Sequence, residues 1–199
     1  MSSLAQLRTA ADCTACELYA DATQTVFGQG RCGAAMVLVG EQPGDREDIE
    51  AEPFVGPAGR LLDRALEQAD ISREDVYVTN VVKHFRFKRE GKRRIHRTPG
   101  IEHVRACLPW LHAELVAVRP RLLVSLGATA AKALLGSLFR LTQHRGEILE
   151  YQDLPLVATV HPSAVLRGPE ERRREMFDEL VVDLALAGRT AAELRAARA

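Results

Sequence analysis

Four short, mostly apolar runs constrain the fold of this chain more than any other feature of its sequence. They occupy residues 35–39, 76–79, 121–126 and 156–160. Runs of this kind, without a polar residue at every second position, are typical of strands buried on both faces of a sheet. Because helical patterns separate them, the strands should run parallel with helices on both sides. The sequence therefore predicts an α/β fold, a three-layer α/β/α sandwich with a central four-stranded parallel sheet.

The segments between the runs carry apolar residues at helical spacing. Leu62 and Leu66 belong to one such pattern, which begins with Gly-Pro-Ala at 56–58 and ends near Ala69. A longer pattern should start at Thr98-Pro99, reach residue 118 and bend at Pro109, which interrupts helical hydrogen bonding. We also expect helices over residues 4–11, 128–133 and 170–187, and a short hairpin or irregular excursion over 141–151.

Length and composition indicate an ordinary globular protein. The chain has 199 residues, of which 46% are hydrophobic and 27% charged, so we expect a single domain over residues 1–199. It has no apolar run of about 18 residues that would span a membrane, and its start lacks the pattern of a signal peptide. These features predict a cytoplasmic protein. Cysteines there rarely form disulfides, so Cys13 and Cys16, a Cys-x-x-Cys pair, suggest a metal, a cluster or a redox pair.

Residues 83–98 form a strongly basic segment between an apolar run and a predicted helix. Eight of its sixteen residues are Lys or Arg and only Glu90 is acidic, which gives +7 in a chain whose formal net charge is zero. The segment could be a solvated, flexible charge run. However, Phe85, Phe87 and Ile95 interleave with the cations, and basic residues beside aromatics suit a nucleic-acid backbone. Since nearby cations disfavour protonation, His96 should be biased towards its neutral, nucleophilic form.

Polar side chains follow three of the apolar runs. Glu41 and Gln42 follow the first in a Gly-rich turn, Asn80 ends the second, and His161 follows the fourth. In parallel sheets ligands bind outside the carboxyl ends of the strands, so we expect these residues and the basic segment to converge on one cleft. A carboxylate there could orient a water or a nucleophile, although a plain solvated turn is the alternative for the Glu41 region.

Several of these residues have both a structural and a functional interpretation. Phe54 could be core or a platform on which a flat ring stacks. Asn80 could cap a turn or read the edge of a pyrimidine with its donor and acceptor. His161 could be an ordinary surface histidine or a donor to a developing oxyanion.

These stretches together resemble the uracil-DNA glycosylase superfamily, specifically its iron–sulfur family 4 type and, within that type, the UdgX branch. The residues 40–44, Gly-Glu-Gln-Pro-Gly, resemble the first motif of that branch. His161-Pro162-Ser163 resembles the second superfamily motif, and Lys92-Arg93-Arg94-Ile95-His96 resembles the inserted loop of the branch. The resemblance extends from Cys13 to the last helix.

The resemblance implies a mechanism in which deoxyuridine is flipped into the cleft. Phe54 would stack on uracil, Asn80 would read its edge, and His161 would stabilise charge on the departing O2. His96 would then attack the sugar C1′ and stay attached, whereas water attacks in ordinary members of the superfamily. The resemblance also implies that Glu41 takes the proton of His96 or orients this histidine. Gln42 would help to hold the site closed, Arg94 would anchor the loop, and Asp45 would contribute to the same environment. Ser163 and Arg167 would contact phosphate.

The resemblance also implies a [4Fe–4S] cluster held by four ligands. Cys13, Cys16 and Cys107 match three of the family cysteines, and His84 stands where the family has the remaining one. Either His84 is the remaining ligand, as histidine is in Rieske centres, or Cys32 replaces it; we favour His84. Three cysteines and one histidine would equally suit zinc on ligand count.

The expected partner is uracil-containing DNA, with single strands accepted, and the expected assembly is a monomer. A metal-bearing DNA-binding module without catalysis, such as a damage sensor, is the competing class. It would not need Glu41, Asn80 and His161 in one cleft, and release of uracil would distinguish the two.

Overall fold

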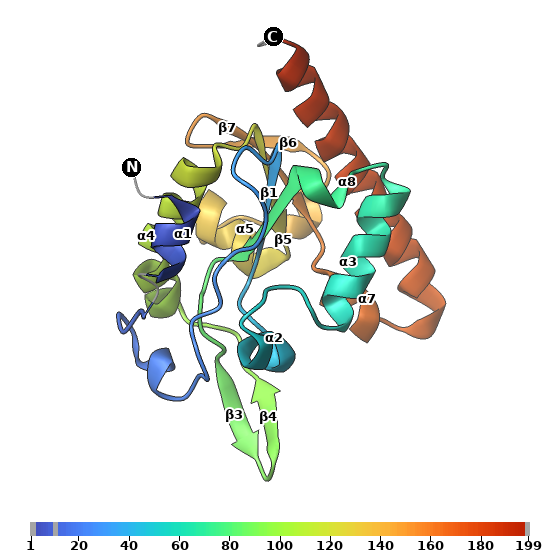
Figure 1. Cartoon of the computed structure of the whole chain (residues 1–199). Coiled ribbons are helices and arrows are strands. Elements are labelled where there is room, and N and C mark those ends of the chain that lie inside the picture. The colour runs from blue at the N-terminus through green and yellow to red at the C-terminus, as the bar shows by residue number, and fades with distance from the viewer. Residues whose placement is uncertain (1–2, 10–11, 198–199) are drawn as a thin grey trace.

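The computed structural model describes residues 3–9 and 12–197 and has a central five-stranded sheet in the order β2-β1-β5-β7-β6 (Figure 1). Four strands are parallel, which confirms the predicted parallel sheet: β1 (Met36–Gly40), β2 (Val76–Asn80), β5 (Leu122–Leu126) and β7 (Leu154–Thr159). The fifth, β6 (Ile148–Tyr151), pairs antiparallel with β7 at the edge. It comes from the segment for which a hairpin or an irregular excursion was expected.

Helices cover both faces of the sheet, as the continuous apolar strands predict. Val37 and Val39 of β1 share one core cluster with Leu111, and Leu38 shares the other with Leu62. Successive strand residues thus face opposite helix layers, so a polar residue at either position would be buried. One layer contains α1 (Leu4–Thr9), α4 (Ile101–Val118) and α5 (Ala128–Leu135); the other contains α3 (Pro57–Gln68), α7 (Pro162–Arg167) and α8 (Arg173–Ala196).

Some helix boundaries differ from the sequence prediction. Helix α4 begins at Ile101 after Gly100, because the side chain of His103 accepts the backbone N–H of Gly100 and caps the first turn there. Helix α8 continues to Ala196, because Thr190 and Ala191 are still buried beyond residue 187. The predicted residues 10–11 of the first helix lie outside the described residues. Three short helices were not predicted: α2 (Asp45–Glu50), α6 (Leu141–His144) and α7. No helix in the described ranges is long and apolar enough to cross a membrane.

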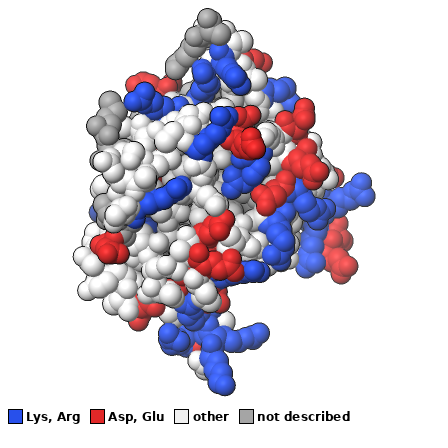
Figure 2. All heavy atoms as spheres, in the orientation of Figure 1, with Lys and Arg blue, Asp and Glu red and all other residues white. Residues whose placement is uncertain are grey.

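The basic segment forms a hairpin that projects from the sheet (Figure 1). Strands β3 (Phe87–Glu90) and β4 (Arg93–His96) pair antiparallel, and Gly91 adopts a positive φ of 61° in the turn. Figure 2 shows Lys and Arg side chains gathered around this projection. Short 3-10 turns complete the structure at Glu17–Ala20, Arg73–Asp75 and Glu170–Arg172.

Candidate active site

The carboxyl ends of the parallel strands bring the predicted residues to one edge of the sheet. Gly40 pairs in register with Asn80 across β1 and β2, and Glu41 follows directly. A Cβ atom at Gly40 would overlap the Asn80 side chain and lie 2.8 Å from the Phe54 ring. Glycine is therefore needed here so that Asn80 and Phe54 can approach the end of β1 together.

Glu41 lies between the hairpin and helix α5. Its Oε2 accepts a hydrogen bond of 2.5 Å from the hydroxyl of Thr129, and its Oε1 lies 3.1 Å from Nε2 of His96. That Oε1 atom is buried and has no aligned hydrogen-bond donor among the described residues, so it remains available. Burial alone would raise the pKa of Glu41, but the proximity of His96 and the Thr129 hydrogen bond outweigh it and lower the pKa. Glu41 is thus an ionised carboxylate beside an imidazole that is 49% exposed.

His161 is neutral, and its tautomer follows from its partners. Burial lowers its pKa to about 4, although Glu41 opposes this effect. Its Nδ1 lies 3.1 Å from the backbone N–H of Ser163, which can only donate, and 2.8 Å from the Ser163 hydroxyl. Nδ1 is therefore the acceptor, and the ring proton of neutral His161 is on Nε2. A neutral N–H donor at the end of β7 suits an oxygen that gains negative charge.

Phe54 and Asn80 provide an aromatic face and a polar edge. Phe54 stacks with the ring of His161 at a centroid distance of 6.0 Å and an interplanar angle of 26°. Its φ of 60° is left-handed, which is rare for a bulky residue and typical of functional sites. Asn80 is 3% exposed, and its amide is not one of the buried polar groups that lack a partner in the described part of the chain. Its side chain offers both a donor and an acceptor at the end of β2.

Gln42 fastens the base of the hairpin to the turn after β1. Its amide nitrogen donates to the carbonyls of Arg86 and Arg97, both at 3.1 Å, and its oxygen accepts the N–H of Arg86 at 3.1 Å. Its polar atoms are therefore occupied by the hairpin.

Arg94 holds the hairpin against helix α2. Its guanidinium bonds Asp45 at 2.5 Å and the fully buried Asp48 at 2.6 Å, and it lies over the rings of Phe85 and Phe87. Asp45 is occupied by this ion pair. Asp48, which was not predicted as a site residue, also accepts the backbone N–H of residue 23.

Ser163 and Arg167 lie on α7, next to His161. Ser163 orients the imidazole, as described above. Arg167 is exposed, and its charge is one of the effects that lower the pKa of His161, after burial. Both residues thus lie beside the cleft.

Cys107 lies on α4, and Cys13 and Cys16 are near enough to affect its pKa. Cys13 and Cys107 are buried and Cys16 is half-buried. The pKa of Cys107 is raised to about 11, mainly by burial, and the neighbouring thiols of Cys16 and Cys13 act in the same direction. Bound metal would reverse this, because a coordinating thiol loses its proton.

His84 and Cys32 differ sharply as candidates for the fourth ligand. Cys32 is exposed, and the backbone N–H of its neighbour Gly33 donates to the carbonyl of Val118. At the usual helical rise, Val118 lies about 16 Å from Cys107 along α4. His84 is 3% exposed, its pKa is lowered by burial, and its Nδ1 has no partner in the described part of the chain. It follows Lys83, whose backbone N–H lies near enough to Cys107 to lower the pKa of that thiol.

The distances between these ligand atoms can be compared with those that a zinc ion or an iron–sulfur cluster requires. Zinc–sulfur bonds of about 2.3 Å place tetrahedral ligands within about 4 Å of one another. Among the described residues, the only group of three His, Cys, Asp or Glu ligand atoms within 4.8 Å of one another is Glu17, Glu102 and His103. No three ligand atoms of the cysteines and His84 lie within that distance of one another. By ligand type, three thiols and an imidazole are a donor set that can hold an iron–sulfur cluster.

Two features of the site were not predicted from the sequence. Thr129 reaches Glu41 from the first turn of α5. Lys83 and Glu114 form an ion pair with no exposed side-chain surface, and the ammonium also donates to the carbonyl of Asn80 at 2.8 Å. A threonine at a helix start and a charged pair 31 residues apart carry no local pattern that would identify them.

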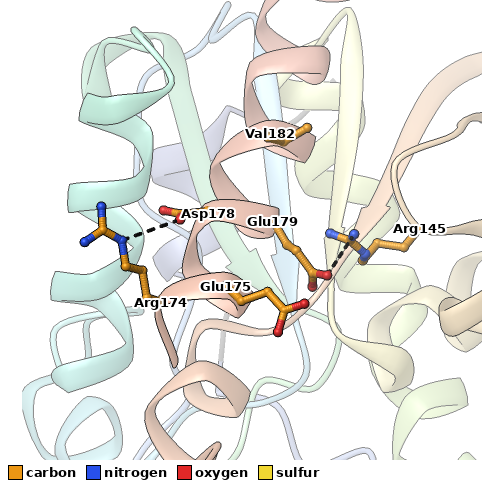
Figure 3. A pocket seen from close by; sticks show the side chains of 6 residues that line it. All are labelled: Arg145, Arg174, Glu175, Asp178, Glu179 and Val182. Carbon is orange, nitrogen blue, oxygen red and sulfur yellow. Dashed lines mark ion pairs between the residues drawn. The ribbon is translucent and has the colours of Figure 1, made fainter. Parts of the chain in front are cut away.

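A surface pocket of about 580 Å³ lies on α8, outside this site (Figure 3). Four of its charged residues pair with each other, Arg145 with Glu179 at 3.5 Å and Arg174 with Asp178 at 3.9 Å. None of the candidate site residues lines it.

Comparisons with known proteins agree with this arrangement. The family model described as "Uracil DNA glycosylase superfamily" matches residues 27–185. The chain is 37% identical over 169 residues to the type-4 uracil-DNA glycosylase of Pyrobaculum aerophilum, which covers 81% of this chain and 83% of the relative. It is also 37% identical over 171 residues to the type-4 uracil-DNA glycosylase of Thermotoga maritima, which covers 84% and 85%. With the match spanning the sheet and both strand-end motifs, the chain belongs to the uracil-DNA glycosylase superfamily and is similar to its type-4 members.

Proposed function

We propose that this protein excises uracil from DNA and then becomes covalently attached to the abasic sugar through His96. The first part rests on family membership and on the type-4 relatives. The second rests mainly on one observation, the 3.1 Å approach of the half-exposed His96 imidazole to Glu41. The same approach supports our proposal that the chain is a member of the UdgX branch.

In the excision step, the flipped uracil lies against Phe54, and Asn80 supplies a donor and an acceptor to its edge. The bond between C1′ and N1 of uracil breaks, and both electrons leave with the base. The Nε2–H of His161 donates to O2 of uracil as negative charge accumulates there. The low pKa of His161 supports this role, since the residue acts as a neutral donor.

In the attachment step, a lone pair of the His96 ring forms the bond to the cationic C1′. The resulting imidazolium loses its N–H proton to Glu41, which is ionised and faces the ring. Water would perform the same attack in ordinary members of the superfamily. Here the hairpin fills that position with His96, which Gln42 and Arg94 hold in place.

We further propose that Cys13, Cys16, Cys107 and His84 bind a [4Fe–4S] cluster. The buried thiols and the unpartnered Nδ1 of His84 support this ligand set. Such a cluster would supply a structural cross-link between the N-terminal segment, α4 and the base of the hairpin, rather than a step of the reaction.

The DNA would contact the hairpin and the start of α7. Lys92 and Arg93 are exposed at the hairpin tip, and Ser163 and Arg167 lie beside the cleft. A projecting hairpin beside the strand ends suits an unpaired nucleotide, so we propose that single-stranded DNA is accepted, by a monomer.

Incubation with uracil-containing single-stranded DNA tests both parts. We expect free uracil and a protein–DNA band that survives hot detergent, with the sugar mapped to His96 by peptide mass analysis. His96→Ala should abolish the band and leave a conventional glycosylase. His144→Ala is a matched control, because His144 is 45% exposed and also lies 3.1 Å from a glutamate, Glu147. Binding without release of uracil would contradict the enzymatic proposal, and a band that persists in His96→Ala would contradict the covalent one.

A further inference from the structure

The hydroxyl of Thr129 forms a hydrogen bond with only one of the two carboxylate oxygens of Glu41. Its hydroxyl donates to Oε2 at 2.5 Å, while Oε1 faces His96. A hydroxyl has one proton to donate, so this bond fixes the carboxylate and leaves the other oxygen towards the histidine. Thr129 itself lies in the first turn of α5, whose preceding Gly127 packs against His161.

From this geometry we infer that Thr129 is a positioning residue that orients Glu41 to receive the proton of His96, and thereby sets how often the sugar cation is captured by His96 rather than by water. The inference rests on the proposed function. It adds a residue that no sequence motif of the chain includes.

The chemistry identifies which step should depend on Thr129. Departure of uracil breaks the C1′–N1 bond, and the electron pair leaves with the base towards His161. Capture by His96 forms an N–C1′ bond, and the ring then loses a proton that Glu41 accepts. Without the Thr129 hydroxyl, Oε2 would lose the donor that holds it, and Glu41 could rotate this oxygen towards His96 or take up a proton. Either change removes an oriented acceptor at the capture step.

The same hydrogen bond contributes to the charge state of Glu41. Burial favours the neutral acid, and the Thr129 hydroxyl and His96 together oppose it. Loss of the hydroxyl should therefore raise the pKa of Glu41, so that a larger fraction is protonated at mildly acidic pH. A protonated Glu41 cannot accept the histidine proton.

Thr129→Val tests the inference, because valine keeps the shape and removes the hydroxyl. The ratio of protein–DNA adduct to free abasic DNA should fall about tenfold, the scale of one hydrogen bond to a charged group. Uracil release should fall less than adduct formation. The acid limb of adduct formation against pH should move to higher pH. Thr129→Ser keeps the hydroxyl and should restore both the ratio and the pH profile.

The outcomes separate this inference from the proposed function. A wild-type ratio and pH profile in Thr129→Val would overturn the role of Thr129 while leaving the His96 attack intact. If the wild type released uracil without any adduct, the His96 attack would be wrong. The inference would then fall with that attack, since no capture by His96 would remain for Thr129 to favour, whereas uracil release would still support the excision step.

Discussion

Lys83 and Glu114 form an ion pair whose side chains are both fully buried. It joins the segment after β2 to the middle of α4, and Tyr77 and Thr79 donate further hydrogen bonds to the carboxylate. The Lys83 ammonium also holds the carbonyl of Asn80. The pair thus links the strand that presents Asn80 to the helix that carries Cys107.

Lys83→Met should strongly destabilise the protein, because it leaves the Glu114 carboxylate buried without a counter-charge. We expect a loss of about 3–5 kcal/mol in the free energy of unfolding. Urea denaturation measures this loss. The double variant Lys83→Met/Glu114→Gln removes both charges and should be more stable than the single variant; equal stability would show that the charge imbalance is not the cause.

The low pKa of His161 makes stability depend on pH in a definite direction. In the unfolded chain histidine titrates near its ordinary pKa of about 6.5, whereas in the folded protein it titrates at about 4. Between these values the unfolded state binds more protons, so the contribution of neutral His161 is complete above about pH 6.5 and is lost as the pH falls towards 4. Urea denaturation from pH 4 to 7 should therefore show a steeper loss in the wild type than in His161→Gln. The same dependence of unfolding free energy on pH in both proteins would contradict the low pKa of His161.

Arg94→Lys should weaken the hairpin anchor, because lysine cannot bond Asp45 and Asp48 in a fork while lying flat on two aromatic rings. We expect adduct formation to fall by about tenfold to a hundredfold, as for a misplaced reacting group, with a smaller effect on uracil release. Arg93→Ala is the control, since Arg93 is exposed and has no partner among the residues described. It should weaken DNA binding without changing the ratio of the products.

Metal ligation can be tested by removing the alternative ligands one at a time. His84→Ala should lower the iron and sulfide content and the visible absorption of the purified protein, and Cys107→Ala should do the same. Cys32→Ser should leave all three unchanged, because Cys32 is exposed and distant from Cys107. Loss of the cluster in Cys32→Ser alone would exclude His84 as the fourth ligand, and zinc in place of iron would exclude the cluster.

The sequence predicted the parts of the fold that depend on local pattern. Buried parallel strands are continuous apolar runs, so their order along the chain and their polar ends could be read directly. The antiparallel β6 alternates between exposed and half-buried residues and lies at an edge, where the pattern is weak. Gln42 was expected to hold the site closed, but its partners on the hairpin could not be derived, since they are 44 and 55 residues away.

At the candidate site, too, contacts between residues far apart in the sequence could not be predicted. Glu41, Asn80 and His161 could be predicted because the ends of parallel strands meet at one edge. Thr129 and Asp48 lie on helices and act through tertiary contacts, for which composition and spacing give no signal. The roles of His96 and of the cysteines came from resemblance to a family rather than from periodicity.

The hydrogen bonds from Gln42 to both ends of the hairpin affect which sequence changes this protein can accommodate. Both ends of the hairpin are tied to one side chain that is the immediate neighbour of Glu41, whereas the turn at Gly91 lies at the far end. His96 and Glu41 are thereby held at the end of the hairpin that is remote from its tip. Residues can be inserted, deleted or recharged around Gly91 to suit a different nucleic-acid structure, while the distance between His96 and Glu41 stays fixed.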